Sequence, residues 1–127
     1  MDREENEDRG LLCQCLAAIS MADDDLDSRE IATQISIIEQ ITGVAPTADE
    51  IVTASIEMGD WQDFIDVVQS RSASLSDEFR TRILQACILI GRADDSMSDV
   101  EGERIYKIAE CLGFERDQVV QQLKIIR

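Results

Sequence analysis

The chain has 127 residues, enough for one domain whose folding buries roughly two-thirds of the extended surface. Its formal net charge of −15 excludes binding to nucleic acid or anionic membrane through a basic surface, and leaves cations or basic proteins as natural partners. Hydrophobic residues reach 44% but aromatic residues only 4%, so we expect an all-α fold of about seven helices, forming a single domain over residues 1–127.

The N-terminal segment is acidic, and a long apolar run follows it. Residues 2–9 lack the basic start of a signal peptide, so we expect a cytoplasmic protein with a solvated acidic turn that runs into the first helix. Residues 11–22 are apolar nearly all round, as in a covered central helix, and are too few to insert into a bilayer. The cysteines lie in similar apolar patterns and are expected to be buried free thiols: Cys13, Cys15, Cys87 and Cys111.

Three more helices are predicted before the middle of the chain. Isoleucines at helical spacing predict an amphipathic helix over residues 28–42 that ends at Gly43. A capping box at residues 47–50 opens a third helix, and Gly59 ends it. The apolar residues of the third and fourth helices are Ile51, Val52, Ile56, Trp61, Phe64, Ile65 and Val68.

The second half repeats this plan after a serine-rich segment, residues 70–76, which is the predicted hinge. The segment from Phe79 to Ile90 predicts a second central helix. An amphipathic helix follows and ends at Gly113, and residues 115–127 predict the last helix.

An internal duplication relates the two halves. The stretch at residues 22–30 recurs at residues 93–101, 71 residues later, and both copies lie between two predicted helices. We therefore expect half-repeats at about 11–58 and 79–127, joined by 59–78, with their two central helices packed about a pseudo-twofold axis.

Each copy of the repeated stretch forms an acidic corner between helices, and helix capping explains only its downstream part. Asp27 with Glu30, and Ser98 with Glu101, have the spacing of capping boxes. Acids in the first turn of a helix gain about 0.3–1 kcal/mol each from its dipole. The upstream aspartates follow the end of a helix instead, where the dipole disfavours anions.

A divalent cation with oxygen ligands would relieve the repulsion among these carboxylates. The spacing is not that of an EF-hand, because no glycine lies inside the corner and the span from the first acid to Glu30 is too short. Calcium or magnesium is favoured over zinc, since the chain has no histidine. The candidate metal ligands are Asp23, Asp24, Asp27, Glu30, Asp94, Asp95 and Glu101.

The pattern of these corners, between a long apolar helix and an amphipathic one, resembles the tellurite-resistance protein B (TerB-like) family over about residues 11–125. The resemblance implies an all-helical accessory protein for metal sensing or stress response, with clustered acids for a divalent cation and no enzymatic chemistry. The chain departs from the family at Asp24 and Asp95, where glycine is common. The residues that carry the resemblance are Ala22, Asp23, Leu26 and Glu30, and then Ala93, Asp94, Met97 and Glu101.

Two functions stay open from the sequence. The first is a cation-binding module in a metal or tellurite stress response, and the second is a protein-interaction or adaptor domain whose acids only cap helices. We expect no catalytic residues and no enzyme, because histidine and a glycine-rich phosphate loop are both missing. We expect protein partners, including membrane-associated ones, and leave a homodimer open.

Overall fold

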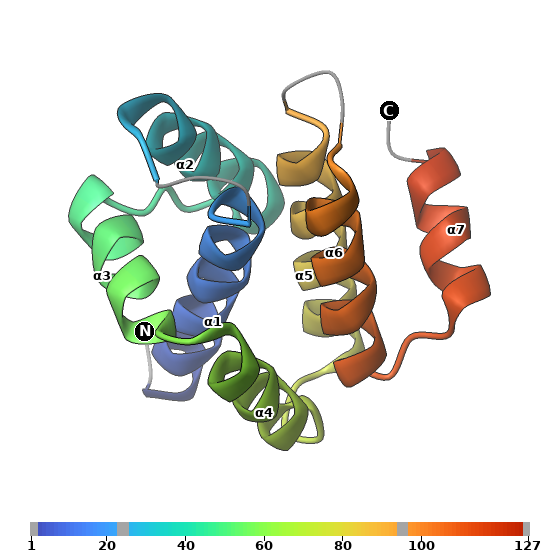
Figure 1. Cartoon of the computed structure of the whole chain (residues 1–127). Coiled ribbons are helices and arrows are strands. Elements are labelled where there is room, and N and C mark those ends of the chain that lie inside the picture. Colours follow the sequence, from blue (N-terminus) through green and yellow to red (C-terminus); the bar gives the residue numbers. More distant parts are fainter. Residues whose placement is uncertain (1–2, 23–25, 94–96, 126–127) are drawn as a thin grey trace.

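The structure is a computed structural model that describes residues 3–22, 26–93 and 97–125, with side chains described from Glu7 onward. Within these ranges the chain forms seven α-helices and no strand, so the predicted all-α fold is confirmed (Figure 1). The helices are α1 (Arg3–Ser20), α2 (Ser28–Thr42), α3 (Ala48–Met58), α4 (Trp61–Ser72), α5 (Asp77–Gly91), α6 (Asp99–Cys111) and α7 (Arg116–Ile125).

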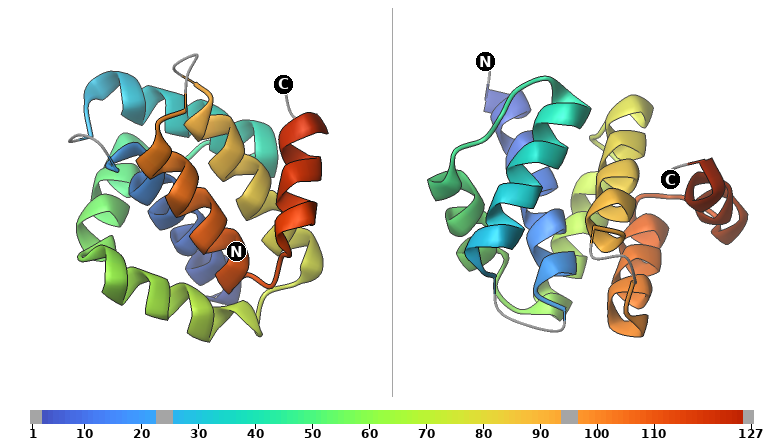
Figure 2. Two further views of the ribbon diagram at one scale, coloured as in Figure 1. Left: turned by 45° about the vertical axis from the view of Figure 1, so that its right-hand side comes forward. Right: turned by 90° about the horizontal axis from the view of Figure 1, so that it is seen from above.

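The helices α1 and α5 pack against each other at the centre and run in the same general direction (Figures 1 and 2). In Figure 1, α2 and α3 lie on one side of this pair, while α6 and α7 lie on the other. The helix α4 crosses the end opposite the two corners and connects the halves. The C-terminal ends of both central helices therefore lie at the same end of the molecule.

The two central helices supply nearly half of the buried hydrophobic residues, and both are buried as their sequences predict. Nearly every residue from Leu11 to Ile19 is buried, because α1 contacts α2, α3, α5 and α6. On α5, the buried side chains run from Ile83 to Ile90. Fully burying one such leucine or isoleucine side chain stabilises the fold by roughly 1.5–3 kcal/mol, so the two central helices contribute strongly to stability.

Two predicted boundaries shift in the structure. The acidic N-terminal segment belongs to α1, which begins at Arg3. Arg71 at the end of α4 holds this segment, because it donates to the Glu7 carbonyl at 3.1 Å and to the Asp8 carboxylate at 2.8 Å. The hinge is shorter than predicted: α4 continues to Ser72, and Ser76 already caps α5.

The third helix turns a different face to the core than its isoleucines suggest. Ile51 is buried as expected, together with Ala54 and Met58. Val52 is 39% exposed and Ile56 is 74% exposed, so these two side chains lie on the outer face of α3. The sequence pattern alone did not identify this pair as exposed.

The predicted pseudo-twofold axis stays a prediction. The helices follow in the same order in both halves, but their third helices pack differently. The helix α3 lies along α1, whereas α7 lies at the edge, with lighter contacts to α6 and α5 (Figure 1).

Candidate functional site

At the first corner, Asp27 caps α2. Its backbone is extended, and its Oδ1 accepts a hydrogen bond from the Glu30 backbone N–H at 2.8 Å. In return, Glu30 Oε1 lies 3.4 Å from the Asp27 backbone N–H. The pair thus satisfies backbone donors that the first turn of a helix leaves unpaired. This confirms the predicted capping box and brings two of the candidate ligands together.

At the second corner, Ser98 and Glu101 cap α6 in the same way. Ser98 Oγ accepts from the Glu101 backbone N–H at 3.1 Å, and Glu101 Oε1 accepts from the Ser98 backbone N–H at 3.1 Å. This predicted capping box is also confirmed. The structure thus pairs the candidate ligand Glu101 with a serine rather than with a second carboxylate.

The remaining candidate ligands, which are the four upstream aspartates, lie outside the described residues. Among the residues that are described, no group of three or more histidine, cysteine, aspartate or glutamate side chains is arranged to hold a metal ion. At the two corners, the structure therefore describes the flanking helices and their caps. The four aspartates in question are Asp23, Asp24, Asp94 and Asp95.

The two corners are connected through Arg104. This residue lies on α6, which begins at the second corner, and its Nη1 donates to the Ala18 carbonyl of α1 at 2.7 Å. A cation at the C-terminal end of a helix is favoured by the helix dipole. The same guanidinium lies 4.5 Å from the ring centroid of Trp61 on α4. Arg104 thus ties the end of α1 to α4 and α6.

Beneath the first corner lies a buried polar pair. Gln34 on α2 is 0% exposed, and its Nε2 donates to Ser20 Oγ at the end of α1, at 3.0 Å. Its Oε1 is buried as well, and no described residue donates a hydrogen bond to it. Gln34 is also the one buried polar residue within the described ranges.

Beneath the second corner, the contacts are apolar. Gly91 ends α5, and a Cβ built on it would come within 2.8 Å of Met97 Cε and 2.9 Å of Ile105 Cδ1. Met97 and Ile105 therefore pack directly against the glycine backbone, and a larger residue at this position would require their side chains to shift.

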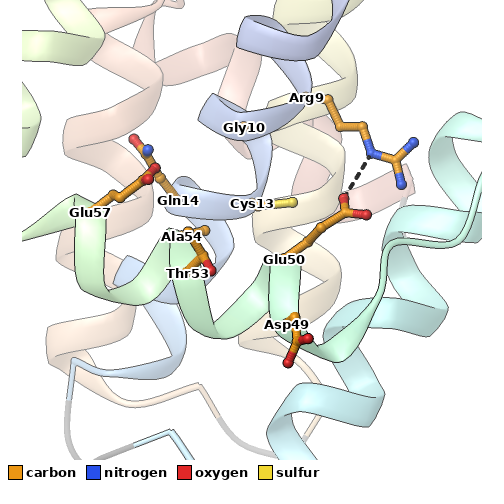
Figure 3. Close-up of a pocket in the computed structure, with 9 residues that line it drawn as sticks. All are labelled: Arg9, Gly10, Cys13, Gln14, Asp49, Glu50, Thr53, Ala54 and Glu57. Carbon is orange, nitrogen blue, oxygen red and sulfur yellow. Dashed lines mark ion pairs between the residues drawn. The ribbon is translucent and has the colours of Figure 1, made fainter. Parts of the chain in front are cut away.

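A groove that the sequence did not predict lies between α1 and α3 (Figure 3). Acidic side chains of α3 and the thiol of Cys13 line it, and Arg9 Nε forms an ion pair with Glu50 Oε2 at 3.5 Å. The two residues are 41 positions apart in the chain, and only the basic character of Arg9 within an acidic segment hinted at a contact. The groove is lined by Arg9, Gly10, Cys13, Gln14, Asp49, Glu50, Thr53, Ala54 and Glu57.

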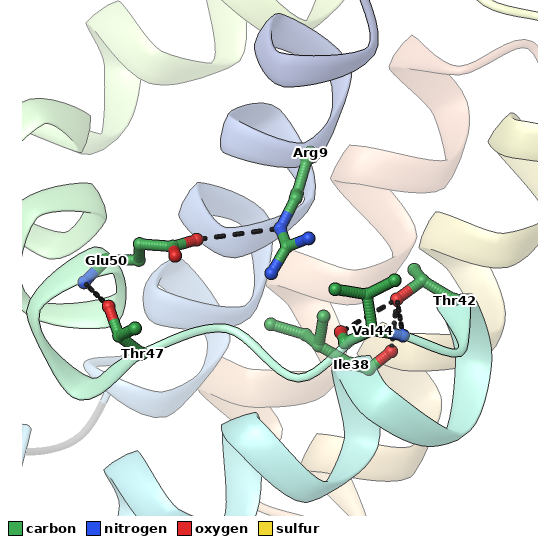
Figure 4. Close-up of polar contacts among 6 residues, drawn as sticks. All are labelled: Arg9, Ile38, Thr42, Val44, Thr47 and Glu50. Carbon is green, nitrogen blue, oxygen red and sulfur yellow. Dashed lines mark hydrogen bonds and ion pairs between the residues drawn. The ribbon is translucent and has the colours of Figure 1, made fainter. Parts of the chain in front are cut away.

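Local hydrogen bonds hold the two ends of the connection between α2 and α3, which are drawn on either side of Arg9 in Figure 4. Thr42 Oγ1 donates to the Ile38 carbonyl at 2.7 Å and accepts from the Val44 N–H at 3.3 Å, which stabilises the end of α2. Thr47 caps α3 by accepting from the Glu50 N–H at 3.1 Å. The connection between α2 and α3 is therefore held at both ends.

The four cysteines are buried free thiols, as predicted. The hydrogen bond to Cys87, together with burial, raises the pKa of Cys15 well above its usual value. Burial also raises the pKa of Cys13 to about 11. Because the thiolate is the reactive form, these thiols act as packing groups at neutral pH.

The fold and the corners thus define the class of protein: an all-helical domain with two capped, acidic corners between helices. The family model described as "Tellurite resistance protein TerB" matches residues 9–124, which is nearly the whole chain, so this chain belongs to the TerB family. Searches of curated proteins and of solved structures gave no match. Of the helices described, none is both long and apolar enough to cross a membrane.

Proposed function

We propose that this TerB family member is an accessory protein, without a reaction of its own, that binds a divalent cation at its acidic corners in the cytoplasm. One observation supports this more than any other. Both capping boxes are complete with Asp27 and Glu30 at the first corner, and with Ser98 and Glu101 at the second. The upstream aspartates are therefore not needed for capping, and another role must account for them.

Electrostatics favours a cation as that role. In sequence the upstream aspartates follow the C-terminal ends of α1 and α5, where unpaired carbonyl groups give the helix a partial negative charge. Neighbouring carboxylates also repel one another. A calcium or magnesium ion binds carboxylate and carbonyl oxygens, so it would offset both costs. Zinc is less suited, because the chain lacks histidine and its thiols are buried.

The test is a calorimetric titration of the metal-free protein with calcium, magnesium and manganese at moderate ionic strength. We expect saturable binding and a higher melting temperature with excess cation. The double variant Asp23→Asn, Asp94→Asn should weaken binding by at least about tenfold.

The matched control is Asp63→Asn, Glu103→Gln, which removes the same charge from exposed positions on α4 and α6. This variant should bind like the wild type. An equal loss in the control would mean general attraction to an acidic surface, and the absence of both heat and a melting shift would overturn the proposal.

A second candidate function is a protein-interaction module whose acids only cap helices. The exposed pair Val52 and Ile56, one turn apart on α3, favours it, because adjacent exposed apolar side chains mark contact surfaces. Under this alternative, Ile56→Glu abolishes binding to a purified partner, while Asp23→Asn, Asp94→Asn leaves it intact. Loss in the aspartate variant that excess cation reverses would favour the first candidate instead. Sedimentation velocity tests the homodimer directly.

A further inference from the structure

The groove between α1 and α3 is hollowed into the surface and has a volume of about 540 Å³ (Figure 3). Ligand pockets in proteins typically measure roughly 300–1,000 Å³, so this groove can take the side chains of a short peptide segment. Cys13 and Ala54 are nearly fully buried beneath it and give it an apolar floor. Gly10 also lines the groove. Apart from its chain neighbours and its own helix backbone, a Cβ built on Gly10 would meet no described atom within 4 Å, so the space above it is open.

The glycine at position 10 is not required by the fold. Gly43 and Gly113 adopt a positive φ, and Gly91 packs closely against two side chains. Neither reason applies to Gly10, which lies within α1, where a glycine destabilises the helix relative to alanine. A side chain at this position would take up part of the open space. The consequence of this glycine is therefore a wider groove.

The acidic walls of the groove are only partly neutralised. Arg9 and Glu50 form an ion pair at one end, but no described residue forms an ion pair with Asp49 or Glu57. Asp49 lies in the first turn of α3, where the helix dipole favours an anion. Glu57 lies in the last turn, where the dipole disfavours one. A cation in the groove would therefore stabilise Glu57 in particular.

The exposed apolar pair on α3 borders this groove. Val52 and Ile56 follow the groove residues Asp49 and Thr53 by three positions each, so they are their neighbours on the helix surface. The pair is exposed to solvent, and adjacent exposed apolar side chains mark contact surfaces. One continuous surface thus combines an acidic groove with an apolar edge.

We propose that this surface, the groove together with Val52 and Ile56, binds a basic amphipathic segment of a partner protein. Lysine or arginine side chains enter the groove, where their apolar stems lie on its floor and their charged ends meet Asp49 and Glu57. Apolar side chains of the same segment pack on Val52 and Ile56. This inference rests on the second candidate function, the protein-interaction module, and does not involve a cation at the corners.

The charge of the chain decides between the possible occupants. With a formal net charge of −15, the chain attracts a basic segment over a long range and speeds its association. The same charge repels a second copy of the chain and an anionic membrane surface. A basic segment of another protein is therefore the occupant that fits.

The chemistry of the occupant can be tested with random peptides displayed on phage and selected on the purified chain at moderate ionic strength. Selected peptides should combine lysine or arginine with leucine, isoleucine or phenylalanine. On binding such a peptide, the amide NMR signals of residues 9–14 and 49–57 should shift most. Selection of acidic or uncharged peptides, selection of none, or shifts confined to other helices would overturn the inference.

Two variants test the groove itself. Gly10→Leu fills the open space and should weaken binding of a selected peptide by at least about tenfold in fluorescence anisotropy. Its melting temperature should not fall, because leucine favours a helix more than glycine does. Gly10→Ala takes up less space and should weaken binding less. Glu57→Gln removes an unpaired charge and should weaken binding about fivefold.

The matched control for Glu57→Gln is Glu103→Gln, which removes the same charge from an exposed position on α6 and should bind the peptide like the wild type. An equal loss in this control would overturn the inference, since general attraction to an acidic chain would explain it. Binding that Ile56→Glu abolishes but Gly10→Leu leaves intact would overturn the groove while the interaction module stands. Calcium affinity should be unchanged in Gly10→Leu, so the proposed cation site succeeds or fails separately.

Discussion

The helices α3 and α7 occupy the same place in the two halves, but they contribute unequally to the core. Three residues of α3 are buried, whereas α7 buries only Val119 among its described residues. Both helices carry a pair of β-branched residues at matching positions, Ile51-Val52 and Val119-Val120. Similar local patterns therefore do not decide how deeply a helix packs. The neighbouring helices decide it, since α3 lies along central α1 while α7 meets the outer face of the bundle (Figure 2).

The largest expected effect comes from the buried side of α3. Ile51 is 0% exposed, so Ile51→Ala should lower the free energy of unfolding by about 2–5 kcal/mol. Urea denaturation followed by circular dichroism measures this loss. The control Ile56→Ala, on the exposed face of the same helix, should change stability by no more than about 0.5 kcal/mol. Equal losses would contradict the assignment of faces.

A somewhat smaller effect is expected where the halves are tied together. Arg104→Ala removes the bond to the Ala18 carbonyl and the contact with Trp61, and should cost about 2 kcal/mol. Arg116 lies 4.6 Å from the Tyr106 ring on the α7 side, and Arg116→Ala should cost only about 0.5–1 kcal/mol. If the Arg116 variant proved the less stable one in urea, α7 would be more than an edge helix.

The buried residue of α7 should matter less than that of α3. Val119→Ala removes two carbon atoms from a nearly fully buried side chain and should cost about 1.5 kcal/mol. Guanidinium denaturation of this variant beside Ile51→Ala compares the two helices directly. A cost for Val119→Ala as large as that for Ile51→Ala would contradict the unequal contribution of α3 and α7 to the core.

An effect smaller than that of Val119→Ala is expected at the caps. Asp27→Ala removes the acceptor for the Glu30 N–H and should cost about 1 kcal/mol, and Ser98→Ala should cost about as much at the second corner. Asp27→Asn retains a capping oxygen and should stay close to the wild type in thermal melts without added cation. A full loss in Asp27→Asn would show that the carboxylate charge, and not the cap, stabilises this corner.

The sequence predicts the features that depend on neighbouring residues. The ends of α2 and α6 follow from Gly43 and Gly113, which both adopt a positive φ, at 81° and 92°. The capping boxes follow from residues three positions apart. The two central helices follow from apolar patterns that continue all round the helix.

Features that depend on distant residues could not be predicted in this way. The hydrogen bond between Ser20 and Gln34 forms only when α2 packs against the end of α1, and a glutamine in an amphipathic helix is ordinarily exposed. The groove at Arg9 and Glu50 likewise depends on how α3 lies along α1. The exposed face of α3 follows from the same packing, since a helix with apolar residues on two faces can bury either.

The contact between Arg104 and Trp61 gives the molecule a built-in optical reporter. Trp61 is the only tryptophan in the chain, so all tryptophan fluorescence comes from the junction of α4 and α6. The same arginine holds Ala18, two residues before Ser20 and the first corner. A shift of the α1 end when the corner is occupied would move the guanidinium over the indole ring and change its emission. Events at an acidic surface without a chromophore can thus be followed without a label.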